Sequence, residues 1–206
     1  MLGRYDQAES GCRYVLALAA KAQPRHHRIQ LRLSALDGLA FVHNMRGQYA
    51  EAESIARTAI RKMEKSAGIP RSIFNGLYCT LGKSLNGQGW HAEAERKLQY
   101  FPRVTGVLLT LTVARLGLNR LEEAEADARE AVRLTEGNLG AAHHVRLDAA
   151  MQLGIVLARQ GRADEARALL QANAHSWTEH FGNQHPKTIA AVSALAQISE
   201  QPGQAQ

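Results

Sequence analysis

Apolar residues recur along the chain with the spacing of amphipathic helices. Five leucines each follow another apolar or aromatic side chain by three residues, and a small residue or threonine comes directly after each of them. These leucines are Leu39, Leu81, Leu111, Leu153 and Leu195. Positions i and i+3 share one helix face, and a small residue beside them lets a second helix approach closely. The pattern predicts five helices, which we call A helices.

A second pattern is a seven-residue phrase that recurs along the chain. It reads GRYDQAE, GQYAEAE, GWHAEAE, NRLEEAE and GRADEAR, beginning at residues 3, 47, 89, 119 and 161, and a further glycine stands at 203. Apolar residues then follow at a four-and-three spacing, as in Ala52, Ala56 and Ala59, which predicts a second amphipathic helix, the B helix. A left-handed turn at the first residue of the phrase and acids near the positive end of the B helix are expected. Each phrase therefore predicts the corner of a helical hairpin.

The corners predict a single array over residues 1–200, with corners at 3, 47, 89, 119, 161 and 203 and a flexible tail at 201–206. Most corners are 42 or 44 residues apart, but Gly89 and Asn119 are separated by 30. Self-similarity at such periods is typical of a helical solenoid. Pro102 should end the B helix of the short repeat at once, so a local change of curvature is expected there.

The hairpins resemble the tetratricopeptide repeat, and in particular its long, kinesin-light-chain type in bacterial proteins. Small residues and glycines recur where that repeat has them, and Gly182, His185, Pro186, Thr188 and Ile189 match its Gly-x-x-His-Pro-x-Thr-Leu opening. The resemblance covers Gly3 to Gly203 and implies an all-α, right-handed superhelical solenoid of antiparallel helix pairs. It also implies a scaffold or sensor that binds partners. The asparagines that line the peptide groove in this family are missing, so its peptide specificity is not expected here.

Composition narrows the function. The net charge of +6 permits contact with nucleic acid, but the basic residues do not cluster, so a nucleic-acid-binding array is the alternative rather than the first hypothesis. Cys12 and Cys79 have no metal-ligand or redox spacing, which fits a reducing cytoplasm. The chain has no run of eighteen apolar residues, so no membrane span is expected.

The sequence gives no positive sign of catalysis, a metal or another cofactor. His143 and His185 occupy the same slot of successive repeats, which favours a structural role at the start of the A helix over metal binding. The acidic pairs recur once in each repeat, whereas an active site is assembled once. Phosphate loops, nucleophile elbows and HExxH helices are absent from the sequence. We therefore expect a protein that is not an enzyme.

The candidate ligand groove consists of the A-helix positions that turn away from the B helix. These positions are Asp37, Phe41, Asn44, Lys83, Asn86, Leu109, Val113, Met151, Ile155 and Arg159. We expect the four apolar residues of the later repeats to hold large apolar side chains of a bound segment, with Lys83 and Arg159 facing its acidic flank. The alternative is that these four residues complete the core.

The first hypothesis is thus a protein-binding or peptide-binding module, such as the sensing part of a bacterial regulator. The expected partner is a protein or peptide segment that is apolar with an acidic flank. The chain also begins at a predicted corner, with a B helix from about Tyr5 and no A helix before it. The packing face of that helix should be uncovered, which favours either a fragment of a longer protein or self-association.

Overall fold

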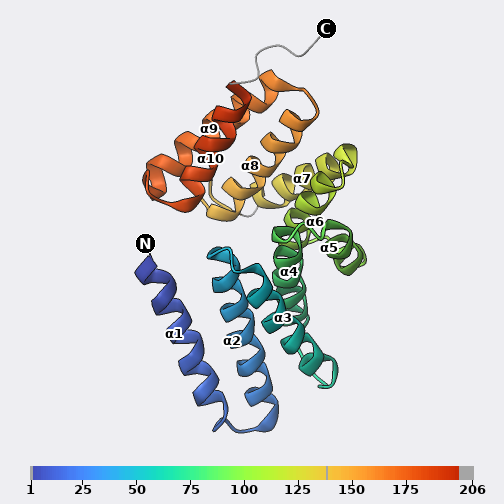
Figure 1. Ribbon diagram of the computed structural model, residues 1–206, viewed down its shortest axis with the longest axis vertical. Helices are drawn as coiled ribbons and strands as arrows, with labels where there is room; N and C mark the ends of the chain where they lie inside the picture. The colour runs from blue at the N-terminus through green and yellow to red at the C-terminus, as the bar shows by residue number, and fades with distance from the viewer. Residues whose placement is uncertain (1, 138, 200–206) are drawn as a thin grey trace. The chain divides into compact units, whose positions relative to one another are not determined.

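The computed structural model describes residues 2–137 and 139–199, and this part of the chain is all-helical (Figure 1). Its helices are α1 (Leu2–Ala19), α2 (Arg25–Met45), α3 (Tyr49–Glu64), α4 (Arg71–Gly87), α5 (His91–Leu98), α6 (Thr105–Gly117), α7 (Leu121–Glu136), α8 (His144–Arg159), α9 (Ala163–Phe181) and α10 (Pro186–Ser199). The even-numbered helices are the predicted A helices and the odd-numbered ones the B helices. The predicted all-α fold of antiparallel helix pairs is confirmed.

The corners at residues 47, 89, 119 and 161 are left-handed turns. The φ angles are 74° at Gly47, 80° at Gly89 and 79° at Gly161. Asn119 has a φ of 57° and is the one residue other than glycine with a positive φ in the described chain, which is consistent with the tolerance of asparagine for this conformation. In each corner the amide after the anchor returns to a carbonyl five residues earlier, as from Trp90 N to Leu85 O, so the turn satisfies the end of the A helix.

The first predicted corner differs from the structure. Gly3 lies inside α1, which already begins at Leu2. A corner needs a helix on each side, and residues 2–19 form one continuous helix, so Gly3 is helical rather than left-handed. The corner predicted at Gly203 and the tail at 201–206 lie outside the described residues.

The helix pairs pack through the small residues that the sequence singled out. A Cβ atom added to Gly154 would lie 2.6 Å from Leu170 Cγ, so α8 and α9 are in close contact at this point. The aligned alanines of the inner B helices are all fully buried; they are Ala52, Ala94, Ala124 and Ala166. Removal of these faces from water is the main term that holds such helices in place, because short helices are marginal on their own.

The chain divides into two compact units. Unit 1 is residues 1–102 and unit 2 is residues 103–206, so the boundary along the sequence follows Pro102. The boundary follows α5, which at eight residues is the shortest helix of the described chain. This is the place where Pro102 predicted an early end to a B helix. In unit 2 the core is built from α8, α9 and α10 with contributions from α6 and α7, and Trp177 is its largest fully buried side chain. A single array over residues 1–200 remains a prediction.

Candidate functional site

Four of the five groove candidates in unit 1 come together where α2 packs against α4. Thr80 on α4 donates a hydrogen bond from Oγ1 to Asp37 Oδ1 at 2.6 Å. The backbone carbonyl of Thr80 also accepts from Asn44 Nδ2 at 3.0 Å. Lys83 Nζ lies 5.6 Å from the centre of the Phe41 ring, within the range of a cation–π contact. Asp37, Phe41, Asn44 and Lys83 therefore form one continuous surface, which we call the α2–α4 face.

The polar groups at the base of the α2–α4 face are only partly satisfied. Asp37 is half-buried, and burial raises the pKa of its carboxyl, although the hydrogen bond from Thr80 and the charge of Lys83 act in the opposite direction. Asn44 Oδ1 is buried and has no hydrogen-bond donor in the described part of the chain. An unpaired buried oxygen and a half-buried carboxyl are both unfavourable for stability.

The outer part of the same face offers an aromatic ring and a cation. The Phe41 side chain is 45% exposed. Lys83 is exposed, and no ion pair to it is found within the described residues. Such a pair can hold an apolar side chain and a carboxylate that lie next to each other on a partner.

Asn86 has a different role from the other candidates of unit 1. Its Oδ1 atom lies 3.1 Å from Nδ1 of His91, the first residue of α5. The side chain is half-buried and links the end of α4 to the start of the next helix. Asn86 is therefore held by the corner that begins α5.

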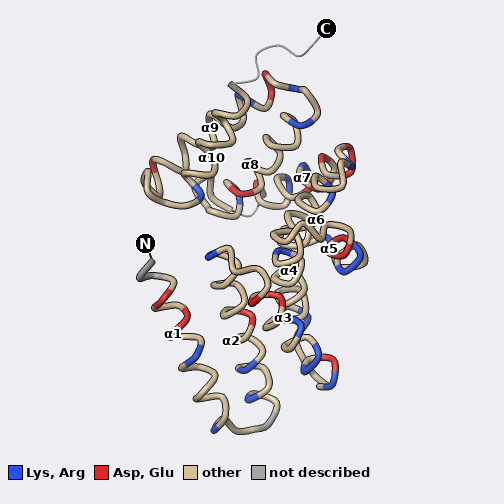
Figure 2. Tube along the Cα trace, viewed as in Figure 1, with Lys and Arg blue, Asp and Glu red and all other residues tan. Residues whose placement is uncertain are grey.

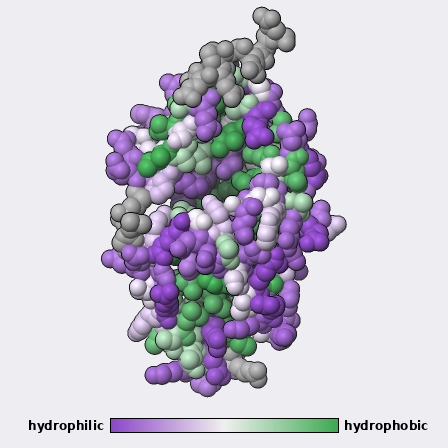
Figure 3. Space-filling model, viewed as in Figure 1, coloured by the Kyte–Doolittle hydropathy of each residue, from purple (hydrophilic) through white to green (hydrophobic). Residues whose placement is uncertain are grey.

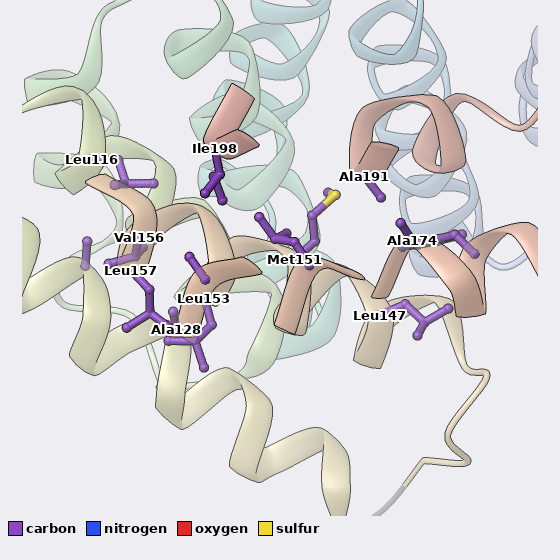
Figure 4. Close-up of a cluster of buried hydrophobic side chains, with 14 residues drawn as sticks. Leu116, Ala128, Leu147, Met151, Leu153, Val156, Leu157, Ala174, Ala191 and Ile198 are labelled. Carbon is purple, nitrogen blue, oxygen red and sulfur yellow. The ribbon is translucent and has the colours of Figure 1, made fainter. Parts of the chain in front are cut away.

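In unit 2 the predicted apolar residues divide between core and surface. Met151 is 4% exposed and lies among Leu147, Ala174, Ala191 and Ile198 in Figure 4. For Met151 the groove prediction is wrong, because α9 and α10 cover its side chain and the core alternative holds.

The other three apolar candidates of unit 2 keep part of their surface. Leu109, Val113 and Ile155 are half-buried, and Leu109 and Ile155 also pack against the core. Arg159 is exposed near the end of α8, and it forms no ion pair with a described residue. Because Lys83 and Arg159 belong to different units, a groove flanked by both remains a prediction.

The acids of the repeated phrase have a role that sequence reasoning missed. The glutamate that ends a phrase reaches the residue just after the next A helix. Gln88 Nε2 donates to Glu53 Oε2 at 2.7 Å, and Gln160 Nε2 donates to Glu125 Oε2 at 2.8 Å. We call these contacts corner links. The recurring glutamate, with a glutamine standing just before the next glycine at 88 and 160, was the signal that could have revealed them.

The corner link at Glu125 includes charged partners. Arg162 Nη1 and Arg129 Nη2 each lie 2.7 Å from Glu125 Oε1. Hydrogen bonds from Gln160, Arg162 and Arg129 lower the pKa of Glu125 to about 2, against the opposing effect of burial. At the corner that contains Gly47, Arg46 makes the equivalent contacts and binds Glu9 and Asp6.

Arginines on the B helices are largely paired with acids. Figure 2 shows blue and red residues next to each other along α3, α5 and α7. These ion pairs include Arg57 with Glu53 and Glu93, Arg129 with Glu125, Arg133 with Glu130, and Arg167 with Asp164. A phosphate backbone would have to compete with these carboxylates for the same guanidinium groups.

The two histidines in equivalent slots are helix caps, as predicted. His143 Nδ1 accepts from Val145 N and His185 Nδ1 accepts from Lys187 N, both at 3.2 Å. The ring of His185 also stacks on Trp177. Within residues 2–137 and 139–199, no group of three or more His, Cys, Asp or Glu side chains is arranged to hold a metal ion. The helices described there are too short or too polar to cross a membrane.

Comparisons with known proteins agree with this architecture. A family model described as tetratricopeptide repeat matches residues 32–72, 110–145 and 146–187. The structure of BtubC (BKLC) from P. vanneervenii is similar with a TM-score of 0.71 at 16% identity, over 95% of this chain and 83% of that chain. Two structures from Podosopora anserina, described as kinesin light chain with nearly identical TPR-like repeats, give TM-scores of 0.62 and 0.61 at 19% identity, over 82% of this chain and 85% and 86% of those chains.

These matches confirm the resemblance to the long, kinesin-light-chain type of repeat. At such low identity the solved structures establish the fold and leave the ligand open. A comparison with curated proteins gave no significant match. The family matches leave out residues 73–109, which contain most of the short repeat.

Proposed function

Since the chain belongs to the tetratricopeptide repeat family, we propose that it is a protein-binding module that uses the α2–α4 face to hold a segment of a partner protein and catalyses no reaction. The observation that carries this proposal is the exposed Phe41 ring with Lys83 above it. Successive A helices present such a surface already formed, which limits the entropy lost on binding.

The chemistry of the face defines the partner segment. A large apolar side chain would pack on Phe41, and a carboxylate one or two residues away would pair with Lys83. In unit 2, Leu109, Val113 and Ile155 would hold further apolar side chains and Arg159 a further acid.

The proposal also includes the cellular compartment of the module and the kind of protein to which it belongs. We place it in the cytoplasm because Cys12 and Cys79 are the two cysteines of the sequence and have no redox or metal-ligand spacing, which suits a reducing compartment. A role as the sensing part of a regulator fits a surface that binds a segment and carries out no chemistry. No cofactor is needed for such binding.

The nucleic-acid alternative is less favoured, because each B helix from α3 to α9 has an arginine that pairs with an acid. It is tested by measuring binding to a generic DNA duplex at 50 mM and 200 mM salt. Affinity that falls steeply with salt, as expected for several phosphate contacts, would favour this alternative over peptide binding.

A phage-displayed library of random dodecapeptides tests the proposed face. We expect selection on the wild-type protein to enrich peptides with a large apolar residue near an acidic one. Phe41→Ala should weaken the enriched peptides about tenfold or more, because a buried aromatic contact contributes about 1.4 kcal/mol or more. Lys83→Glu should weaken them most at low salt.

Lys21→Glu is the matched control, because it makes the same charge change at an exposed position near the end of α1. It should leave peptide affinity unchanged. The proposal fails if no peptide family is enriched, or if the enriched peptides bind the Phe41 and Lys83 variants as tightly as the wild type. Far-UV circular dichroism on each variant separates lost binding from lost folding.

A further inference from the structure

The first B helix has a face that its counterparts bury. Ala8 of α1 occupies the position of Ala52, Ala94, Ala124 and Ala166 in the four later B helices. Those four alanines are 0% exposed, whereas Ala8 is exposed. The B helices α3, α7 and α9 each lie between two A helices, whereas α1 packs on α2 alone among the described helices. The surface around Ala8 is therefore a side of α1 on which none of the described A helices packs.

The last A helix, α10, also has an exposed face that its counterpart α8 buries. Ile189 and Ala196 of α10 occupy the positions of Leu147 and Gly154 in α8. Leu147 and Gly154 are buried, but Ile189 is 52% exposed and Ala196 is exposed. Val192, on the same side of α10, is 49% exposed. Among the described helices α10 packs on α9 and α8, and neither of them covers this side.

The α8–α9 hairpin shows how the missing contacts are made. A Cβ atom on Gly154 would lie 2.6 Å from Leu170 Cγ, and Asn173 Nδ2 donates to Leu147 O at 2.8 Å. In the numbering of the repeat, Leu170 corresponds to Cys12 of α1 and Asn173 to Val15. The same packing would therefore place Ala196 against Cys12 and Ile189 against Val15. The two uncovered faces are the complementary halves of one hairpin.

We propose that α10 of one copy packs against α1 of a second copy and so completes a helical hairpin between two chains. The exposed face of α10 that would be covered consists of Ile189, Val192, Ser193 and Ala196, none of which is charged. Burying apolar side chains of this size stabilises the contact, and no charge has to be desolvated on the α10 side. Apolar surface is visible over α1 and α2 and over α9 and α10 in Figure 3.

The pairing joins two different surfaces, so it is a head-to-tail contact. Each added copy leaves one α1 face and one α10 face open, and association continues until a ring closes or a filament forms. The contact uses none of the residues of the α2–α4 face. It goes beyond the proposed binding of a partner segment, and either can fail without the other.

Blocking one end at a time tests the proposal. Ala8→Arg and Ala196→Arg each place a charge on an exposed position, so both variants should fold. Light scattering coupled to size exclusion should give a wild-type mass above one copy that rises with concentration, and about one copy for each variant alone. An equimolar mixture of the two variants should give a dimer, because each supplies the face that the other has lost. A wild-type monomer at every concentration, or a mixture that stays monomeric, overturns the proposal.

A disulfide tests the register of the contact. In a Cys79→Ser background, Ala196→Cys should form a disulfide with Cys12 of a second copy. At the corresponding positions of α8 and α9, a Cβ atom added to Gly154 would touch Leu170, and Cβ atoms about 4 Å apart suit a disulfide. Ala190→Cys, exposed on another side of α10, is the control and should crosslink at least tenfold more slowly. Equal rates at the two positions, or crosslinking through Cys12 alone, would contradict the head-to-tail register.

Binding of the selected peptides is measured on the same variants. Phe41→Ala and Lys83→Glu should leave the mass distribution unchanged, and Ala8→Arg should leave peptide affinity unchanged. Loss of peptide binding with intact association would refute only the proposed function. Intact peptide binding in a strictly monomeric protein would refute only the head-to-tail contact.

Discussion

At the scale of single residues, Asp37 has a half-buried carboxyl group, and burial disfavours its ionised form. Its carboxylate accepts one hydrogen bond, from Thr80, and burial raises its pKa above the ordinary value of 3.8. A raised pKa means that the folded state binds the proton more tightly than the unfolded state does. The contribution of Asp37 to stability is therefore complete below about pH 3.8 and falls as the pH rises through the folded-state pKa.

Asp37→Asn should for this reason stabilise the folded protein at pH 7, by about 0.5–1 kcal/mol, the size of a modest single-site effect. Asparagine keeps an oxygen that can accept the hydrogen bond from Thr80 and removes the charge. The advantage over wild type should vanish near pH 3, where Asp37 is protonated in both states. Urea unfolding at the two pH values measures this difference.

Asp164→Asn is the control for the change in net charge, because the side chain of Asp164 is 99% exposed. It should alter stability little at either pH. A variant Asp37→Asn that is less stable than wild type at pH 7 would show that the ionised carboxylate is favourable where it lies.

Residue roles were predictable only where the repeat constrains them. The structural role of His143 and His185 at the start of the A helix followed from one slot recurring in two repeats. The burial of Met151 could not be predicted in this way. An A-helix position that turns away from the B helix of its own hairpin can still be covered by the next A helix, here α10. The four unit 1 candidates that come together between α2 and α4 were placed by periodicity alone, but the ring–cation contact between Phe41 and Lys83 needed coordinates.

At the scale of helices, the corners were the most predictable feature. Glycine or asparagine has a physical reason to occupy a left-handed turn, and Gly47, Gly89, Asn119 and Gly161 all do so. Gly3 shows the limit of this argument, since glycine permits the turn and does not require it. The close contact between α8 and α9 restricts the choice of residue at Gly154 more strongly, because even a methyl group lacks space there.

Gly154→Ala should lower the free energy of unfolding by about 1 kcal/mol. The added Cβ would lie 2.6 Å from Leu170 Cγ, and overpacking of about 1–3 kcal/mol exceeds the roughly 1 kcal/mol that alanine gains over glycine in a helix. Gly11→Ala is the matched control, since Gly11 is also helical and has no atom within 4 Å of the new Cβ. It should raise stability by up to about 1 kcal/mol. Thermal and urea unfolding measure both, and equal effects at the two positions would rule out a close contact at Gly154.

At the scale of the whole chain, the division at Pro102 has an energetic counterpart. Each unit contains its own buried residues, with Leu77 fully buried in unit 1 and Leu170 in unit 2. In repeat proteins stability is set by each repeat and its neighbours, so distant parts can open separately. The sequence indicated this boundary through Pro102 and the short repeat, but not that two compact units would result.

Leu77→Ala should destabilise unit 1 by about 2–5 kcal/mol and leave unit 2 as stable as before. In a Trp90→Phe background, Trp177 is the sole tryptophan and reports on unit 2, where it is 1% exposed. At low protein concentration, Leu77→Ala should shift the midpoint seen by circular dichroism and leave the fluorescence midpoint in place. Leu170→Ala should instead shift the fluorescence midpoint. Equal shifts of both midpoints in the Leu77 variant would mean that the units unfold together.

The corner links bear on how such a chain changes length over evolutionary time. Glu53 and Gln88 lie 35 residues apart, as do Glu125 and Gln160, so each link closes within about one repeat. A duplication or deletion of a whole repeat carries one glutamate and one corner residue with it, and every new junction can form the link again. The number of repeats can therefore change by recombination without new interactions, whereas one residue inserted at a corner would separate the partners of a link.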